Sequence, residues 1–243
     1  MRIDRFAAVV SSIGTFSATV IILFTLFELG NQRKSAYKPD LVFGKKDFYI
    51  YANKSTNTAD IWSPIPLTRS DFKQVKHPTP MLLNLYNIGM GAAKTITANW
   101  KLDIDGSINT IKELDTKKQY VIVTENQLLK ISHLGHKTWI PIPSADLFDY
   151  ILPAHVEKEP HKLMLPYLYQ FFTSIIFTLS SEKAQEFTYP SSPKFKVILN
   201  YFDIGNNEHK KEFSIDIRPG LTILEKDRAL AEITGTIELK ETK

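Results

Sequence analysis

A long apolar stretch near the amino terminus constrains this chain more than any other feature. It runs from Phe6 to Leu29 and carries one charge, Glu28, at its far edge. A helix rises about 1.5 Å per residue, so roughly 20 apolar residues cross the hydrocarbon core of a bilayer. The stretch therefore predicts a transmembrane α-helix, with residues 1–29 as the anchor.

A cleaved signal peptide is the alternative, since Arg2 and Arg5 supply a basic start. The apolar core of a signal peptide is usually about 7–15 residues long and is followed by a cleavage site made of small residues. This stretch is longer and continues as LFELGNQRK, without such a site. We therefore predict an uncleaved anchor.

Flanking basic residues predict the orientation, because Lys and Arg are enriched on the cytoplasmic side of a membrane helix. Arg2 and Arg5 precede the stretch, and a larger set follows it closely: Arg33, Lys34, Lys38, Lys45 and Lys46. The expected location is the bacterial inner (cytoplasmic) membrane, as a single-pass protein with its soluble domain in the cytoplasm.

Small residues recur along the same stretch at spacings of three and four, at Ala7, Ser11, Gly14 and Ala18. Residues at this spacing share one face of a helix, and small faces let membrane helices approach each other closely. The pattern is typical of ordinary membrane-helix composition, with self-association of the anchor as the alternative.

Composition excludes several classes of function. With 43% hydrophobic residues the chain can build a core, and its net charge of +4 comes from lysines and acids that alternate throughout. Nucleic-acid binders usually concentrate positive charge on one face, so we expect no nucleic-acid partner. The absence of cysteine excludes disulfides, thiolate catalysis and zinc sites built on sulfur.

The rest of the chain predicts a mainly β, β-sandwich-like domain over residues 41–243 with one or two helices, joined to the anchor by a basic tether over residues 30–40. Alternating apolar residues predict strands, and one helix is expected over residues 105–115. A long loop is expected over residues 54–79, which are rich in Pro, Ser and Thr. The main predicted strands cover residues 47–53, 80–89 and 92–103, and QYVIVTENQLLKIS predicts two strands around a tight turn. KFKVILNYFDIGNNEHKKEFSIDIRP predicts a hairpin with GNN as its turn, and EITGTIELK predicts a further strand.

An uncharged stretch from Leu163 to Leu179 stands out from this pattern. Pro166 suits a helix start. At 17 residues the stretch is at the lower limit for crossing a bilayer, and it would divide the strands between the two sides of the membrane. It predicts a buried or membrane-facing helix packed on the sheet, with a second span as the alternative.

The motif NIGMGAAKT, residues 87–95, resembles a phosphate-binding loop. A P-loop needs glycine directly before the lysine and again five positions earlier, but Ala93 and Ile88 stand there. The residues that follow are strand-like. The motif therefore predicts a corner between strands, at which Gly89 or Gly91 supplies a positive φ or a bulge.

Other short motifs give no catalytic, cofactor-binding or metal-binding residue that we assign. LDIDGS resembles the Asp-x-Asp of a phosphatase, but the chain lacks the alternating helices and strands that such an enzyme needs. His133 and His136 lack a third ligand, and Ser-x-x-Lys occurs twice, at SAYK and SSEK, without its companion motifs. Asp103, Asp105 and His133 are the residues to test first if the protein is an enzyme, a hydrolase for instance.

Several segments together resemble a pattern in uncharacterised bacterial single-pass membrane proteins with an N-terminal anchor and a β-rich soluble domain. They are ELGNQRK, LNLYNIGMGAAKTI, YILP before LMLPYLY, and YFDIGNNEHKKEFSIDI. The resemblance covers most of the chain. It implies this architecture and no activity.

The expected function is a membrane-tethered, non-enzymatic domain that binds a protein or an envelope component. A membrane sensor or effector, for example in phage defence, is the alternative and would act through oligomerised anchor helices. The expected partners are the lipid bilayer and a protein, or a second copy of this chain bound through the anchor. No cofactor is expected.

Overall fold

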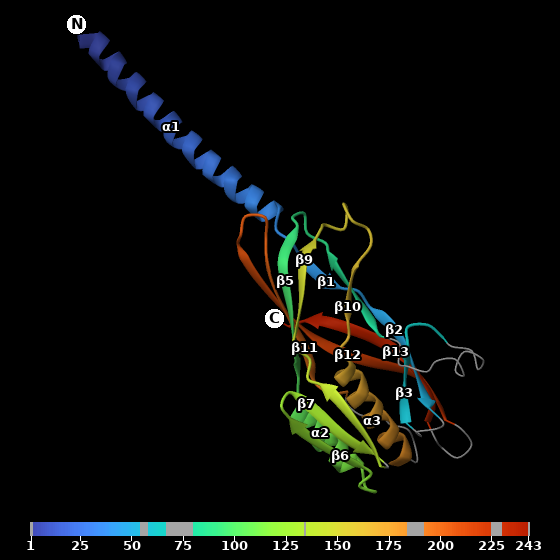
Figure 1. Ribbon diagram of the computed structural model, residues 1–243. Helices are drawn as coiled ribbons and strands as arrows, with labels where there is room; N and C mark the ends of the chain where they lie inside the picture. Colours follow the sequence, from blue (N-terminus) through green and yellow to red (C-terminus); the bar gives the residue numbers. More distant parts are fainter. Residues whose placement is uncertain are drawn as a thin grey trace.

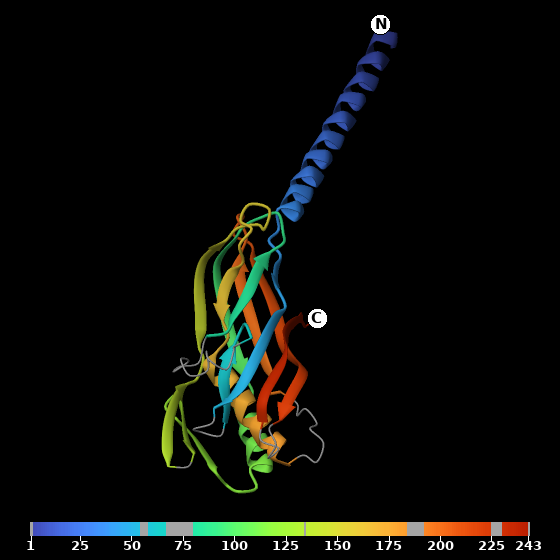
Figure 2. The same cartoon turned by 90° about the vertical axis from the view of Figure 1, so that its right-hand side faces the viewer.

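The computed structural model describes residues 2–53, 58–66, 80–133, 135–183, 192–224 and 230–242. A long helix projects from an elongated, mainly β body that carries two shorter helices (Figures 1 and 2). The prediction of a mainly β domain with helices is confirmed. The described residues form thirteen strands, more than the sequence pattern indicates.

Helix α1, Arg2–Ala36, contains the predicted apolar stretch. The prediction that it is a transmembrane anchor is corrected: within the described part of the chain, no helix is both long and apolar enough to cross a bilayer. The physical reason is the polar residues in its described side chains, 15–32, which include Thr15, Ser17 and Glu28. Ala7, Ser11 and Gly14 of the predicted small-residue face lie outside the described side chains.

The predicted tether is also shorter than expected, because α1 continues through Ala36. Only Tyr37–Asp40 connect it to the first strand. These four residues, with at most about 3.6 Å each, cannot carry the body far from the end of the helix.

A curled seven-stranded sheet, the large sheet, forms most of the body, and all its neighbouring strands are antiparallel. In spatial order its strands are β3 (Thr58–Ser63), β2 (Lys46–Asn53), β13 (Leu230–Glu241), β12 (Glu208–Leu224), β11 (Phe195–Phe202), β5 (Ala93–Leu102) and β9 (Ala145–Ile151). Strand β3 lies inside the predicted loop over residues 54–79, so the loop prediction is wrong for this part. Trp62 of β3 is buried in the core, but the Pro and Ser residues next to it make the segment resemble a loop in the sequence.

The short sheet consists of β1 (Leu41–Phe43), β4 (Leu82–Asn87) and β10 (His161–Met164). It packs against the large sheet, where Phe43 meets Phe213 edge-on with ring centroids 5.1 Å apart. Strands β4 and β5, which are adjacent in sequence, belong to different sheets. The residues between them therefore form the predicted corner, not a hairpin.

The distal sheet lies at the end of the body away from α1 and consists of β6 (Tyr120–Glu125), β7 (Leu128–His133) and β8 (His136–Pro141) (Figure 1). It accompanies the predicted short helix α2, Ile104–Leu114, and the helix α3, Tyr167–Lys183. The tight turn between β6 and β7 is confirmed, with positive φ at Asn126 and Gln127.

Helix α3 confirms the prediction of a buried helix. Its described side chains from Leu168 to Ser180 are buried, apart from a half-buried Phe171. The buried Trp62 of β3 donates its indole N–H to Ser174 Oγ at 2.8 Å. A helix enclosed in this way has no face left for lipid, which excludes a second span here.

Candidate functional site

The glycine corner NIGMGAAKT is built around one buried amide, Asn87, which is 1% exposed. Its Oδ1 accepts from the backbone N–H of Asp40 at 3.0 Å and of Gly89 at 3.1 Å. Its Nδ2 donates to the carbonyl oxygens of Gly91 at 2.7 Å and Ile151 at 3.2 Å. All four hydrogen-bonding positions of the amide are used, so Asn87 joins the α1 connection, the corner and the end of β9.

The corner holds protein backbone in the place where a P-loop would hold phosphate. A Cβ at Gly91 would lie 1.7 Å from the carbonyl oxygen of Tyr37, and one at Gly89 would lie 2.3 Å from that of Lys38. The prediction that one of these glycines supplies a positive φ is wrong, because among the described glycines only Gly135 has one. Glycine is required here because two segments of backbone touch.

The two aspartates of LDIDGS are structural. Asp103 is the N-cap of α2, and its carboxylate accepts from the N–H of Gly106 at 2.9 Å. A Cβ on Gly106 would lie 2.4 Å from that carboxylate, which explains the glycine of the motif. Asp105 is in the exposed first turn of α2, where its negative charge interacts favourably with the helix dipole and stabilises the helix.

His133 and His136 face each other across the turn from β7 to β8. The ring of His133 stacks on Tyr120 with centroids 4.2 Å apart. No group of three potential metal ligands occurs among the described residues. Of the two Ser-x-x-Lys matches, Ser35 lies in α1 outside the described side chains, and Ser180 is buried in α3.

A small pocket of about 70 Å³ lies between β4, β9 and the loop that follows β9. Its lining includes His161, Glu157 and Glu159, so it joins a histidine to carboxylates. Burial lowers the pKa of His161, opposed by Glu157. Ligand pockets usually measure about 300–1,000 Å³. None of Asp103, Asp105 and His133 lines this pocket, and its size gives a substrate no room.

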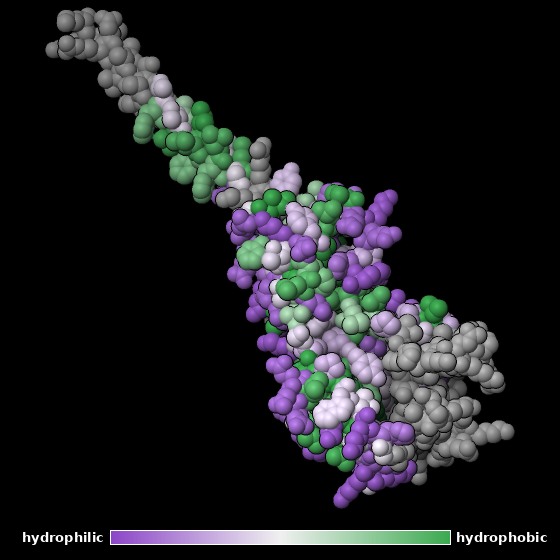
Figure 3. Space-filling view, in the orientation of Figure 1, coloured by the Kyte–Doolittle hydropathy of each residue, from purple (hydrophilic) through white to green (hydrophobic). Residues whose placement is uncertain are grey.

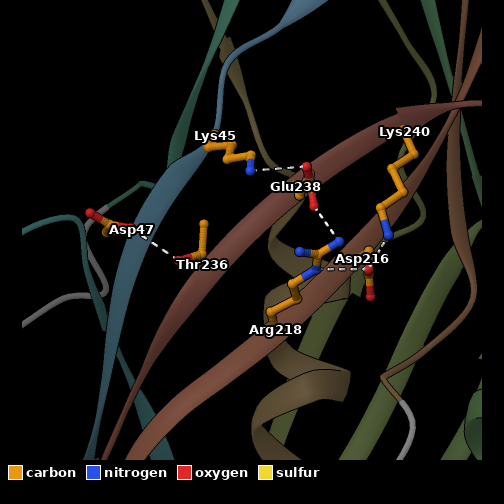
Figure 4. Close-up of polar contacts among 7 residues, drawn as sticks. All are labelled: Lys45, Asp47, Asp216, Arg218, Thr236, Glu238 and Lys240. Atoms are coloured by element: carbon orange, nitrogen blue, oxygen red, sulfur yellow. Dashed lines mark hydrogen bonds and ion pairs between the residues drawn. The ribbon is translucent and has the colours of Figure 1, made fainter.

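The outward face of β2, β12 and β13 carries a row of ion pairs (Figure 4). Arg218 contacts Glu238 at 2.6 Å and Asp216 at 3.4 Å, and Lys240 contacts Asp216 at 2.8 Å. The hydrogen bond from Lys240 lowers the pKa of Asp216. Exposed pairs of this kind contribute about 0–1 kcal/mol each, and the charges of Asp216, Arg218, Glu238 and Lys240 already have partners of opposite sign. This face therefore has little free charge for a ligand.

The outer face of the distal sheet carries several exposed apolar side chains. Val121, Val123 and Trp139 are exposed there, while Leu129 and Ile140 on the opposite face are buried. Register places Val123, Lys130 and Trp139 side by side, and the Lys130 ammonium lies 4.9 Å from the centroid of the Trp139 ring. No single stretch of sequence predicts this surface, because three paired strands contribute to it.

The turn between β11 and β12 is held by Asp203, which is largely buried. Its carboxylate accepts from the backbone and side chain of Asn207, both at 2.8 Å, and lies 3.1 Å from His209 Nε2. Burial alone would raise the pKa of Asp203, but the hydrogen bonds from Asn207 and His209 outweigh it and lower the pKa to about 2.

This carboxylate predicts an acid-sensitive turn. Because the folded pKa lies below the ordinary value of 3.8, the ionised group stabilises the protein above pH 4. This stabilisation is lost as the pH falls from about 4 to about 2. In urea unfolding at pH values from 4 down to 2, we expect the difference in free energy of unfolding between wild type and Asp203→Asn to shrink. We also expect Asn207→Ala to have a lower free energy of unfolding than wild type at all pH values above 4. Parallel curves for wild type and Asp203→Asn would contradict the assignment.

Comparisons with protein-family models, with curated proteins and with solved structures find no match to this chain in any of the three.

Proposed function

We propose that this protein is a non-enzymatic, membrane-attached interaction module that presents the outer face of its distal sheet to a protein partner. The observation that carries the proposal is this uncovered face, with Trp139 48% exposed, at the end of the body opposite α1. Partly exposed Trp beside a basic side chain is typical of residues that dominate protein interfaces.

Membrane attachment is supported by the exposure of α1. Eight of its described apolar side chains are 47–72% exposed: Phe16, Ile21, Ile22, Leu23, Phe24, Leu26, Phe27 and Leu29. At about 100° per residue they are distributed all around the helix, between polar residues such as Ser17 and Glu28, and their exposure favours apolar surroundings. The hydroxyls of Thr19 and Thr25 donate to the carbonyls of Thr15 and Ile21, which satisfies them without water.

The chemistry of the distal face indicates the class of partner. Val121, Val123 and Trp139 form its apolar part, with Lys130 and Lys137 on the same side of the sheet. A protein surface that combines apolar side chains with acidic ones complements this face.

Site-specific photo-crosslinking in native membranes tests the proposal. A photo-reactive amino acid at Trp139 is expected to capture a protein that one at Leu147 does not, although Leu147 on β9 is 75% exposed. With that protein purified, Trp139→Ala should weaken binding at least about tenfold, and Leu147→Ala should leave it unchanged. Equal capture from both positions, or undiminished affinity of Trp139→Ala, would refute the proposal.

A further inference from the structure

A second group of exposed apolar side chains lies at the opposite end of the body, around the base of α1. We call it the apolar collar: Tyr37, Ile88, Met90, Leu152, Val156 and Ile204, which are 36–61% exposed. Single exposed apolar residues are ordinary on protein surfaces. These six come from four segments that are far apart in sequence, and each is at or next to the tip of a connection.

Hydrogen bonds show that the four segments lie side by side. The N–H of Ile88 donates to Asp40 O at 2.8 Å, and the N–H of Ala154 donates to Asn87 O at 2.7 Å. Lys94 Nζ donates to Asn206 Oδ1 at 2.6 Å, which holds the β11–β12 turn against the start of β5. The loops meet at the end of the body from which α1 emerges (Figures 1 and 2).

The connection between α1 and the body, Tyr37–Asp40, is short and is held in place by contacts with the body. Backbone contacts of Tyr37 and Lys38 with the glycine corner fix its path, and Lys211 pairs with Asp40 at 2.5 Å. Whatever surrounds the end of α1 must therefore also meet the collar. Apolar atoms lie among polar ones around the base of the helix (Figure 3).

We propose that the apolar collar is a lipid-contacting surface, by which the body rests on the membrane to which α1 attaches. This inference rests on the proposed membrane attachment. Exposed charges of both signs flank the collar, at Lys38, Lys158, Glu157 and Glu208. Contact therefore depends on insertion of apolar side chains into the interface and is expected to change little with salt concentration.

The absence of cysteine allows a direct test with single-cysteine variants of the full chain. An environment-sensitive fluorophore is attached to Val156→Cys, Ile204→Cys, Leu23→Cys or Val123→Cys, and each protein is reconstituted into phosphatidylcholine–phosphatidylglycerol vesicles. We expect blue-shifted emission, several-fold brighter and quenched by spin-labelled lipid, from positions 156, 204 and 23. Position 123, on the distal sheet, serves as the control, and its fluorophore should show the emission of a water-exposed site and no quenching by spin-labelled lipid.

The outcomes separate this inference from the function on which it rests. Lipid quenching at Leu23→Cys without quenching at Val156→Cys and Ile204→Cys would refute lipid contact by the collar but would still support membrane attachment through α1. No quenching at Leu23→Cys would overturn the attachment as well. A blue shift at 156 and 204 that grows with protein concentration and resists lipid quenchers would overturn the collar in favour of pairing with a second copy.

Discussion

Replacing Asn87 by alanine is expected to lower the free energy of unfolding by about 3–6 kcal/mol, because each buried group left without a partner costs about 1–3 kcal/mol. The change removes the side-chain hydrogen bonds to the N–H groups of Asp40 and Gly89 and to the carbonyls of Gly91 and Ile151. These groups belong to three different segments. The loss is therefore expected to loosen the α1 connection, the corner and the end of β9 together.

Asn84→Ala is the matched control. Asn84 lies on the same strand, three residues earlier, and its side chain accepts one exposed hydrogen bond, from Lys162 Nζ at 2.7 Å. Its replacement is expected to change stability by less than about 0.5 kcal/mol. Urea unfolding of the full chain in mild detergent, followed by tryptophan fluorescence, measures both variants. Similar midpoints for the two variants would show that Asn87 does not hold the junction.

The sequence predicts the local elements of this fold well where the hydrophobic period is strong. Helix α2 is confirmed, and so are the β11–β12 hairpin and the buried α3. In each case the information is local: apolar spacing of 3.6 or 2, a proline at a helix start, or a turn residue. The aspartate cap of α2 was not predicted. Strand β3 was missed because its surroundings are rich in Pro and Ser.

Long-range relations could not be predicted in the same way. Asn87 sits in a motif that suggested phosphate, but its partners include Asp40 and Ile151, which lie 47 and 64 residues away. The same holds for Trp62 and Ser174, which are separated by 112 residues. The collar and the distal face also arise only when the sheets bring separate loops or strands together, so no single stretch of sequence signals either surface.

Replacing Gly91 by alanine is expected to cost about 2–4 kcal/mol, since overpacking costs about 1–3 kcal/mol and the hydrogen bond between Asn87 and Gly91 is strained with it. The new Cβ would lie 1.7 Å from the carbonyl oxygen of Tyr37 and 2.7 Å from its carbonyl carbon. Both are backbone atoms, so no side-chain rotation relieves the clash. Either the α1 connection or the corner must move.

Gly30→Ala is the control for this change, because a Cβ at Gly30 in α1 meets nothing within 4 Å. It is expected to be neutral or to stabilise the helix by up to about 1 kcal/mol. If the fixed connection is what brings the collar to lipid, Gly91→Ala should reduce lipid quenching at Val156→Cys and leave quenching at Leu23→Cys unchanged. Equal quenching at Val156→Cys with and without Gly91→Ala would mean that the collar reaches the bilayer by its own affinity, independently of the junction.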